Sequence, residues 1–195
     1  MGAVPEAGVS KGAVRPRTVS ESRTHKRRIL FLVLLAGLLG GLFWDGSPLG
    51  TLALHQALVM KFPLVRQVTP TELVSWMQDP KRPPPLLVDV RVQAEFQHSH
   101  LQGAVHLDPT AADLSPLQRI PYEQPIVVYD AAGAGGTAMV VALSRAGYRR
   151  LSNLDGGVFR WVNQGHPVVT AQGEAHTVAA ASWFWGRLLK ARYRP

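Results

Sequence analysis

Between about residues 66 and 168, apolar residues occur in short continuous runs that alternate with amphipathic stretches. The runs 86–90, 103–107 and 126–129 are each typical of a strand buried on both faces. Helical patterns cover 69–78, 92–97, roughly 111–118, 137–146 and 157–163. Strands that alternate with short helices predict an α/β domain with a small parallel sheet and helices on both faces.

A different pattern precedes this domain. Residues 29–44 form an uncharged apolar run directly after Lys26, Arg27 and Arg28. A helix of this length rises roughly 24 Å, and the flanking basic residues together with Trp44 extend its reach towards the ~30 Å hydrocarbon core. We therefore expect a single-pass transmembrane signal-anchor. A buried helix and a cleaved signal peptide are the alternatives, but no small-residue cleavage site follows the run.

The distribution of basic residues predicts the orientation of this anchor. Basic residues precede the run, and none follows it until Lys61, which places the N-terminus in the cytoplasm. We expect a basic disordered segment at 1–28, the anchor at 29–44 and a linker at 45–65. The α/β domain at 66–168 then lies on the periplasmic or extracytoplasmic side.

Charge and cysteine content exclude several classes of function. The formal net charge is +8, but residues 64–170 carry nine basic and nine acidic side chains, so the domain has no net attraction for a phosphate backbone. We expect no nucleic-acid partner. The chain has no cysteine, which excludes disulfides, thiolate metal sites, iron–sulfur clusters and a thiol nucleophile.

The C-terminal residues 169–195 carry a net charge of +3. If 178–193 is helical, its apolar and basic residues separate onto opposite faces: Phe184, Trp185, Leu188, Leu189 and Tyr193 against Arg187, Lys190 and Arg194. This pattern predicts a basic amphipathic helix that contacts membrane lipid through 178–194. A helix packed on the domain or on a partner is the alternative.

One loop combines glycine and alanine with a single acidic residue. Residues 130–137 read Asp-Ala-Ala-Gly-Ala-Gly-Gly-Thr, and they follow a predicted buried strand and precede a helix. Small residues at such a position allow backbone N–H groups to converge on an anion. The alternative is an ordinary tight turn between strand and helix.

The order of several motifs resembles the rhodanese-like (sulfurtransferase) family. The matching residues are Leu87-Val88-Asp89-Val90-Arg91, Glu95-Phe96, His100 to Leu107, Pro125 to Tyr129, Ala146-Gly147-Tyr148, and Leu154-Asp155-Gly156-Gly157 with Trp161. The resemblance covers about 66–168 and implies the rhodanese-like fold. In active members, a cysteine at the end of the fourth of these segments begins a C-x-x-G-x-R loop and carries sulfur as a persulfide.

Laid onto this chain, the resemblance places the cysteine position at Asp130 and the arginine position at Gly135, whereas Gly133 keeps the family's glycine. A carboxylate cannot carry a persulfide. We expect the Asp130 carboxylate to accept N–H bonds from its own loop, as a helix cap does. The alternative is an aspartyl nucleophile for phosphoryl transfer, which would need Mg²⁺ ligands and a general acid nearby.

Other polar residues are expected to have structural roles. His98, His100, His106 and Asp108 lie close together in sequence, but they lack a helical i, i+4 histidine pair, so we expect loop residues and no metal site. The resemblance implies that Asp89 and Arg91 form a structural ion pair. Gly156 and Gly157 are expected to serve a tight turn.

Together these inferences predict a catalytically inactive, membrane-anchored rhodanese-like domain that binds or scaffolds a protein partner. Asp130, Gly133 and Gly135 mark its degenerate catalytic loop, and we expect no cofactor. The alternatives are an enzyme that uses Asp130 for phosphoryl transfer and a structural subunit of a membrane complex.

Overall fold

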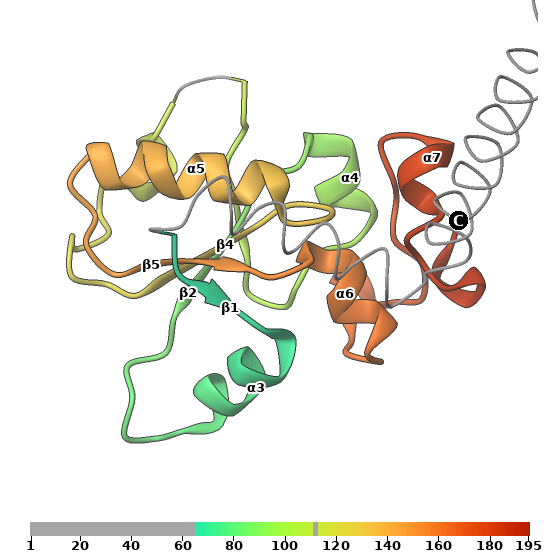
Figure 1. Cartoon of the computed structure of the whole chain (residues 1–195), viewed down its shortest axis with the longest axis horizontal. Coiled ribbons are helices and arrows are strands. Elements are labelled where there is room, and N and C mark those ends of the chain that lie inside the picture. The colour runs from blue at the N-terminus through green and yellow to red at the C-terminus, as the bar shows by residue number, and fades with distance from the viewer. Residues whose placement is uncertain (1–64, 111–112) are drawn as a thin grey trace, which may run out of the picture. The chain divides into compact units, whose positions relative to one another are not determined.

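A computed structural model of the chain describes residues 65–110 and 113–195. Five strands of this part form one parallel sheet in the order β1-β5-β4-β2-β3 (Figure 1). Their bounds are β1 Gln67–Val68, β2 Leu86–Asp89, β3 Val105–His106, β4 Ile126–Tyr129 and β5 Leu151–Leu154. The parallel α/β architecture predicted from the alternating pattern is confirmed.

The connections are short helices, followed by a C-terminal hairpin and two further turns. The helices are α3 Pro70–Gln78, α4 Gln93–His98, η1 Ser115–Leu117, α5 Ala134–Arg145, α6 Gly157–Asn163, α7 Trp183–Gly186 and η2 Ala191–Tyr193. The hairpin pairs β6 Val168–Thr170 with β7 Gly173–Ala175 in antiparallel register. The sequence pattern did not predict β5 or this hairpin.

Helix α3 begins where its sequence dictates. Thr69 caps the helix: its hydroxyl accepts from the Glu72 N–H at 3.2 Å, and the Glu72 carboxylate accepts from the Thr69 N–H at 2.8 Å. Pro70 occupies the first turn, where a missing N–H costs nothing. This capping box fixes the start of the helix that crosses from β1 to β2.

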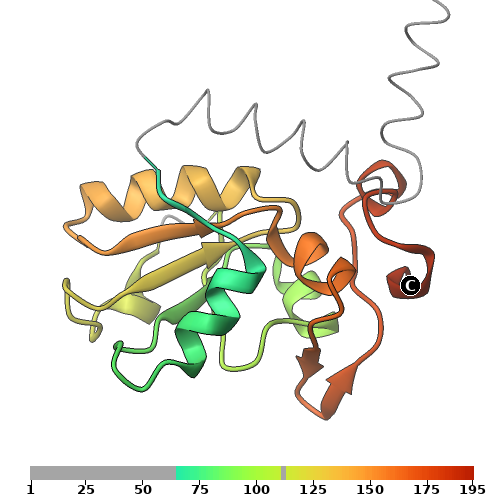
Figure 2. The ribbon, with the colours of Figure 1, turned by 60° about the horizontal axis from the view of Figure 1, so that its bottom comes forward.

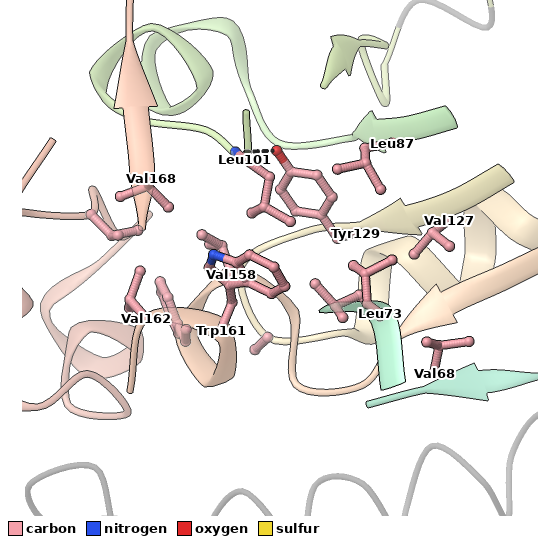
Figure 3. Packing of buried hydrophobic residues seen from close by; sticks show 14 of the residues in the cluster. Val68, Leu73, Leu87, Leu101, Val127, Tyr129, Val158, Trp161, Val162 and Val168 are labelled. Carbon is pink, nitrogen blue, oxygen red and sulfur yellow. Dashed lines mark hydrogen bonds between the residues drawn. The ribbon is translucent and has the colours of Figure 1, made fainter. Parts of the chain in front are cut away.

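The sheet is covered on both faces, and alternate strand residues supply the two cores (Figure 2). Leu87, Val127 and Tyr129 face α3 and α6, which lie on one side. Val88 and Val128 face α5 and η1 on the other side. Figure 3 shows the first of these clusters, including Leu73 of α3 and Trp161 of α6. Burial of both faces explains why the central strands read as unbroken apolar runs.

One predicted helix is largely absent. The pattern predicted a helix over roughly 111–118, but the structure has only the 3₁₀ turn η1 from Ser115 to Leu117 there, and residues 111–112 are not described. The Asp113 side chain accepts from the Ser115 N–H at 2.8 Å, which stabilises a local turn. Leu117 is buried and anchors this turn to the core.

The C-terminal prediction of one amphipathic helix over 178–193 is wrong. Only α7 and the 3₁₀ turn η2 are helical there, and Leu188 and Leu189 are buried in the same core as α6. The amide of Asn163 explains the break, because it donates to the Leu188 carbonyl at 2.7 Å and accepts from the Lys190 N–H at 2.8 Å. Tertiary packing therefore overrides the helical periodicity, and residues 169–195 pack against the domain rather than form a separate element.

The predicted membrane anchor lies in a part of the chain that the structure does not describe. Residues 1–28, the apolar run 29–44 and the linker up to residue 64 lie outside the described residues. Across 65–110 and 113–195, no helix is long and apolar enough to cross a bilayer.

Candidate functional site

The candidate site is the loop from β4 to α5. All four residues of β4 are buried, and Asp130 follows immediately at the carboxyl edge of the sheet. Gly133 precedes α5 with a φ of +101°, a left-handed conformation that favours glycine. The chain therefore reverses sharply, and the first N–H groups of α5 point back towards the end of β4.

The Asp130 carboxylate occupies this turn. Its Oδ2 accepts from the Gly135 N–H at 2.7 Å, and its Oδ1 accepts from the Gly133 N–H. A Cβ on Gly135 would lie 3.0 Å from Oδ2, so glycine leaves room for the side chain to reach the helix N-terminus. The predicted cap is confirmed, and two N–H groups of the loop therefore have an acceptor from the same chain.

The surroundings of Asp130 disfavour its negative charge. Burial raises the pKa of the Asp130 carboxyl above its ordinary value, and the N–H groups of Gly135 and Gly133 offset part of that rise. Asp89, whose charge also raises the pKa of Asp130, ends the neighbouring strand β2. The loop thus holds a carboxyl whose charge is stabilised mainly by two backbone amides.

The N-terminus of α6 closes over the same loop. Val158 and Phe159 donate their N–H groups to the carbonyls of Asp130 and Ala131, each at 3.0 Å. Gly157 has a φ of +56°, and a Cβ there would lie 2.4 Å from the Asp130 carbonyl oxygen. The tight turn predicted for Gly156 and Gly157 is confirmed, and its close approach fixes the backbone of the candidate site.

Asn153 of β5 is a site residue that the sequence reading missed. Its side-chain N–H₂ donates to the Gly133 carbonyl at 3.1 Å and to Gln67 Oε1 at 2.8 Å. Its Oδ1 lies 2.3 Å from the position of a Cβ on Gly136, so that position excludes any side chain. The sequence signal for this residue was an asparagine in a short segment that begins and ends with leucine. A buried amide in such a segment needs specific hydrogen-bond partners.

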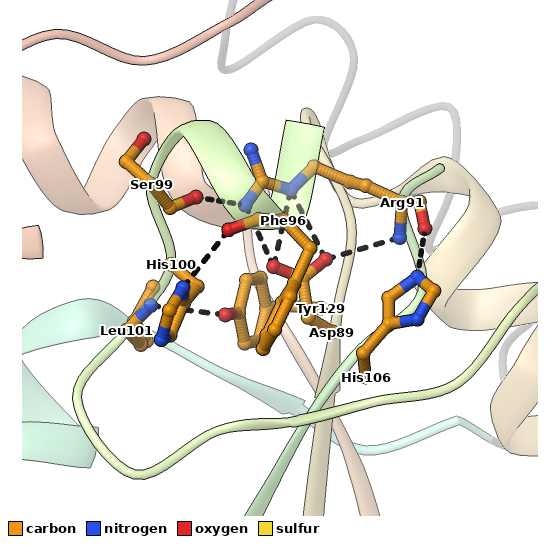
Figure 4. Close-up of polar contacts among 8 residues, drawn as sticks. All are labelled: Asp89, Arg91, Phe96, Ser99, His100, Leu101, His106 and Tyr129. Atoms are coloured by element: carbon orange, nitrogen blue, oxygen red, sulfur yellow. Dashed lines mark hydrogen bonds and ion pairs between the residues drawn. The ribbon is translucent and has the colours of Figure 1, made fainter. Parts of the chain in front are cut away.

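A buried ionic network lies beside this edge of the sheet (Figure 4). The Arg91 guanidinium lies 2.6 Å from an Asp89 carboxylate oxygen, both side chains are almost fully buried, and Arg91 also donates to the Ser99 carbonyl at 2.5 Å. Tyr129 accepts from the Leu101 N–H at 3.0 Å. The predicted Asp89–Arg91 ion pair is confirmed, and it ties the end of β2 to the segment after α4.

Glu95 adds a third buried carboxyl to this region. It lies on α4, is 8% exposed, and burial raises its pKa, although the Arg91 charge opposes the shift. The charges of Asp89 and Asp130 raise the pKa further. The Asp89 charge therefore acts on both Glu95 and Asp130 at this end of the sheet, where Arg91 is a buried cation.

The loop position expected for the histidines is wrong for two of them, because His98 ends α4 and His106 ends β3, and each ring makes a separate contact. His100 Nδ1 lies 2.9 Å from the Phe96 carbonyl, and His106 Nε2 lies 2.7 Å from the Arg91 carbonyl. His98 Nε2 lies 3.0 Å from the Thr177 hydroxyl. No group of three potential metal ligands occurs in the described residues, and Asp108 bonds Thr110 of its own turn.

Comparison with known proteins identifies the fold. The profile of the rhodanese-like domain matches residues 69–164. A sulfurtransferase from Allochromatium vinosum is 32% identical over 88 residues, which are 45% of this chain and 81% of that protein. The probable adenylyltransferase/sulfurtransferase MoeZ from Mycobacterium tuberculosis is 27% identical over 101 residues, but the match spans only 25% of its length and 51% of this chain.

A solved structure agrees with these sequence matches. The solution structure of the rhodanese-like domain from the Anabaena sp. Alr3790 protein superimposes with a TM-score of 0.50 at 21% identity, covering 61% of this chain and 93% of that one. This likeness shows the fold, and the Allochromatium relative adds a sequence relationship over most of its own length. The chain belongs to the rhodanese-like family.

Proposed function

We propose that this rhodanese-like domain binds or scaffolds a protein partner and carries no sulfur as a persulfide. The observation that supports the proposal is the Asp130 carboxylate, which accepts the Gly133 and Gly135 N–H groups at the position where the family pattern has its cysteine. The chain has no cysteine that could take over this role, so the loop lacks a nucleophilic sulfur.

The proposal also includes a membrane location. The uncharged run 29–44 and the preceding Lys26, Arg27 and Arg28 favour a single-pass anchor with a cytoplasmic N-terminus. The domain is then presented on the extracytoplasmic side of that membrane. A binding domain held there acts at high local concentration on membrane-bound partners.

The binding role is favoured over phosphoryl transfer through Asp130. Both oxygens of Asp130 accept an N–H bond from the loop, and these bonds withdraw electron density from the carboxylate and lower its nucleophilicity. A structural role within a membrane complex is a form of the same binding function.

Sulfur transfer by the full-length chain tests the first half of the proposal. Purified protein is incubated with thiosulfate and cyanide, and we expect no thiocyanate above the rate without protein. A sample treated with ³⁵S-thiosulfate should retain no label after denaturing electrophoresis. Turnover or retained label in the unaltered protein would contradict the proposal.

Site-specific crosslinking tests the binding half. A photoreactive residue replaces Ala138, which is exposed in α5 next to the loop, and Ser75, which is exposed in α3, serves as the matched control. We expect one discrete protein adduct in native membranes from position 138 and none from position 75. Absence of an adduct at 138, or equal adducts at both positions, would contradict binding through this edge of the sheet.

A further inference from the structure

The C-terminal tip, defined here as residues 182–187, presents aromatic side chains on the surface of the domain. Trp183 is 74% exposed and Trp185 is 37% exposed, and α7 spans most of this tip. A tryptophan side chain has an accessible surface of about 200 Å². Leaving much of it in water is unfavourable, because burial of apolar surface gains roughly 25 cal/mol per Å² of free energy. Exposed tryptophans on a soluble surface therefore point to a second surface that covers them.

The tip is held rigidly, so the exposure does not come from a loosely attached tail. Leu188 and Leu189 are buried in the core directly after it. Asn163 binds the backbone on both sides of Leu189, at the Leu188 carbonyl and the Lys190 N–H. The Arg194 guanidinium donates to the carbonyls of Gly186 at 3.1 Å and Leu189 at 2.8 Å. These contacts preorganise the tip in its exposed position.

The chain segment that carries the tip has charge of one sign. Residues 175–195 contain four basic residues and no aspartate or glutamate. The Arg187 guanidinium lies 4.3 Å from the centre of the Trp183 ring, and Lys190 and Arg192 are exposed. A surface that covers this tip must therefore be negatively charged and must accept indole rings.

We propose that the C-terminal tip docks onto the surface of an anionic lipid bilayer. Tryptophan prefers the membrane–water interface, where its ring is apolar and its N–H remains solvated. Basic side chains beside it gain about 1 kcal/mol each from anionic lipid, which corresponds to about fivefold in binding per charge. The contact is made by a folded tip with its leucines buried, and not by a helix lying along the membrane.

This inference uses only the membrane location from the proposed function and is independent of the Asp130 loop. The absence of cysteine allows a single probe to be placed anywhere in the full-length chain. Ser182→Cys places a polarity-sensitive fluorophore on the tip, and Ser75→Cys on α3 is the matched control, since both serines are exposed. The labelled chains are reconstituted into nanodiscs of phosphatidylcholine alone or with phosphatidylglycerol.

We expect the probe at position 182 to report an apolar environment and reduced quenching by iodide only in discs that contain phosphatidylglycerol, whereas the probe at 75 stays aqueous in both. Replacing Lys190 and Arg192 together by glutamine should weaken this docking by about 25-fold. Trp183→Ser should also reduce it. All three positions are exposed, so equal thermal unfolding midpoints will verify the fold of the variants.

The outcomes separate this inference from the membrane anchor. A chain that elutes with the discs while position 182 stays aqueous in anionic lipid overturns the docking and leaves the anchor intact. A chain that is released from phosphatidylcholine discs but still shows docking in anionic discs overturns the anchor and supports the tip. A crosslink from position 182 to a protein, with no lipid response, shows a protein contact and overturns the inference.

Discussion

The Asp130 carboxylate and the backbone N–H of Gly135 meet at 2.7 Å, five residues apart across the turn into α5. A side chain thereby supplies the negative charge for which the N-terminus of a helix is suited. Two N–H groups of this turn, those of Gly133 and Gly135, therefore have their acceptor within the chain. The first two predictions follow from this contact.

The stability of the protein should depend on pH through Asp130. Burial raises the pKa of its carboxyl in the folded state, so the native chain holds this proton more tightly than the unfolded chain does. The stabilisation is complete below the unfolded value of about 3.9 and is lost as pH rises through the folded pKa. Relative to Asp130→Asn, the unaltered protein should therefore lose stability as pH increases.

Urea unfolding of both proteins from pH 3.5 to 7.5 measures this difference. The slope cannot exceed about 1.4 kcal/mol per pH unit, which is the value for one proton. Because the Asp130 charge also raises the pKa of Glu95, the comparison is made in a Glu95→Gln background, which removes the contribution of that carboxyl. If the unaltered protein's free energy of unfolding, relative to that of Asp130→Asn, stays constant or rises with pH, the raised pKa of Asp130 is contradicted.

Asp130→Cys should give a thiol whose pKa lies above its ordinary value of about 8.5. The burial that raises the pKa of the Asp130 carboxyl also disfavours a thiolate, and the N–H groups of Gly133 and Gly135 offset only part of that effect. The pH dependence of alkylation by iodoacetamide gives this pKa. Ser75→Cys, at an exposed position of α3, should titrate normally. A pKa at position 130 equal to or below that of the control thiol would show that the loop N–H groups outweigh burial, and would contradict the prediction.

Breaking the buried ion pair should be costly. Arg91→Met leaves the Asp89 carboxylate buried without its cation, and we expect a loss of about 3–5 kcal/mol in the free energy of unfolding. The double variant Asp89→Asn with Arg91→Met should recover part of this loss. The control is Arg149→Met, which breaks the exposed Arg149–Glu123 pair and should cost under about 1 kcal/mol. Equal losses for Arg91→Met and Arg149→Met would exclude a special role for the buried pair.

Much of the fold follows from local sequence features. The unbroken apolar run of β4 and the Thr69-Pro70-Glu72 cap of α3 each have one physical interpretation, and both elements form as predicted. The carboxylate cap of the loop was also predictable, because Asp130 precedes small residues at a strand-to-helix junction. These features depend on neighbours within a few residues.

The missed elements depend on distant contacts. Strand β5 contains Ser152 and Asn153, which interrupt its apolar run, and the buried Asn153 N–H₂ group bonds Gln67 and Gly133, which are distant in sequence. The tail was predicted as a helix because its apolar residues recur with helical spacing. Asn163, which is 25 residues from Leu188, binds the backbone there and turns the chain. No pattern within the tail could reveal that contact.

The approach of α6 to the loop predicts a sharp difference between two glycines. Gly157→Ala and Gly165→Ala both place a side chain at positive φ, which costs about 1–2 kcal/mol. At Gly157 the new methyl group also meets the Asp130 and Ala131 backbone within 2.4–2.7 Å, whereas nothing lies within 4 Å of a methyl group at Gly165. We expect Gly157→Ala to cost about 1–3 kcal/mol more in urea unfolding. Equal costs would contradict the close approach.

Removing the Asn163 side chain should loosen the C-terminal segment. Asn163→Ala leaves the Leu188 carbonyl and the Lys190 N–H without their partner, so we expect a loss of about 1–3 kcal/mol. Hydrogen exchange at residues 186–190 should accelerate more than exchange in β4. The neighbouring exposed Gln164→Ala is the control and should leave both unchanged. Unaltered hydrogen exchange at residues 186–190 in the Asn163 variant would contradict a stabilising role for the two Asn163 hydrogen bonds.

Because Leu188 and Leu189 are buried, the folding unit extends beyond the segment that matches the family. The family match stops at residue 164, yet Val168, Val178 and these two leucines complete the core beside α6. A fragment that ends at the family boundary would expose the hydrophobic surface that the C-terminal residues cover, and we expect it to aggregate on expression. Anyone preparing the domain alone should retain the chain through Arg194.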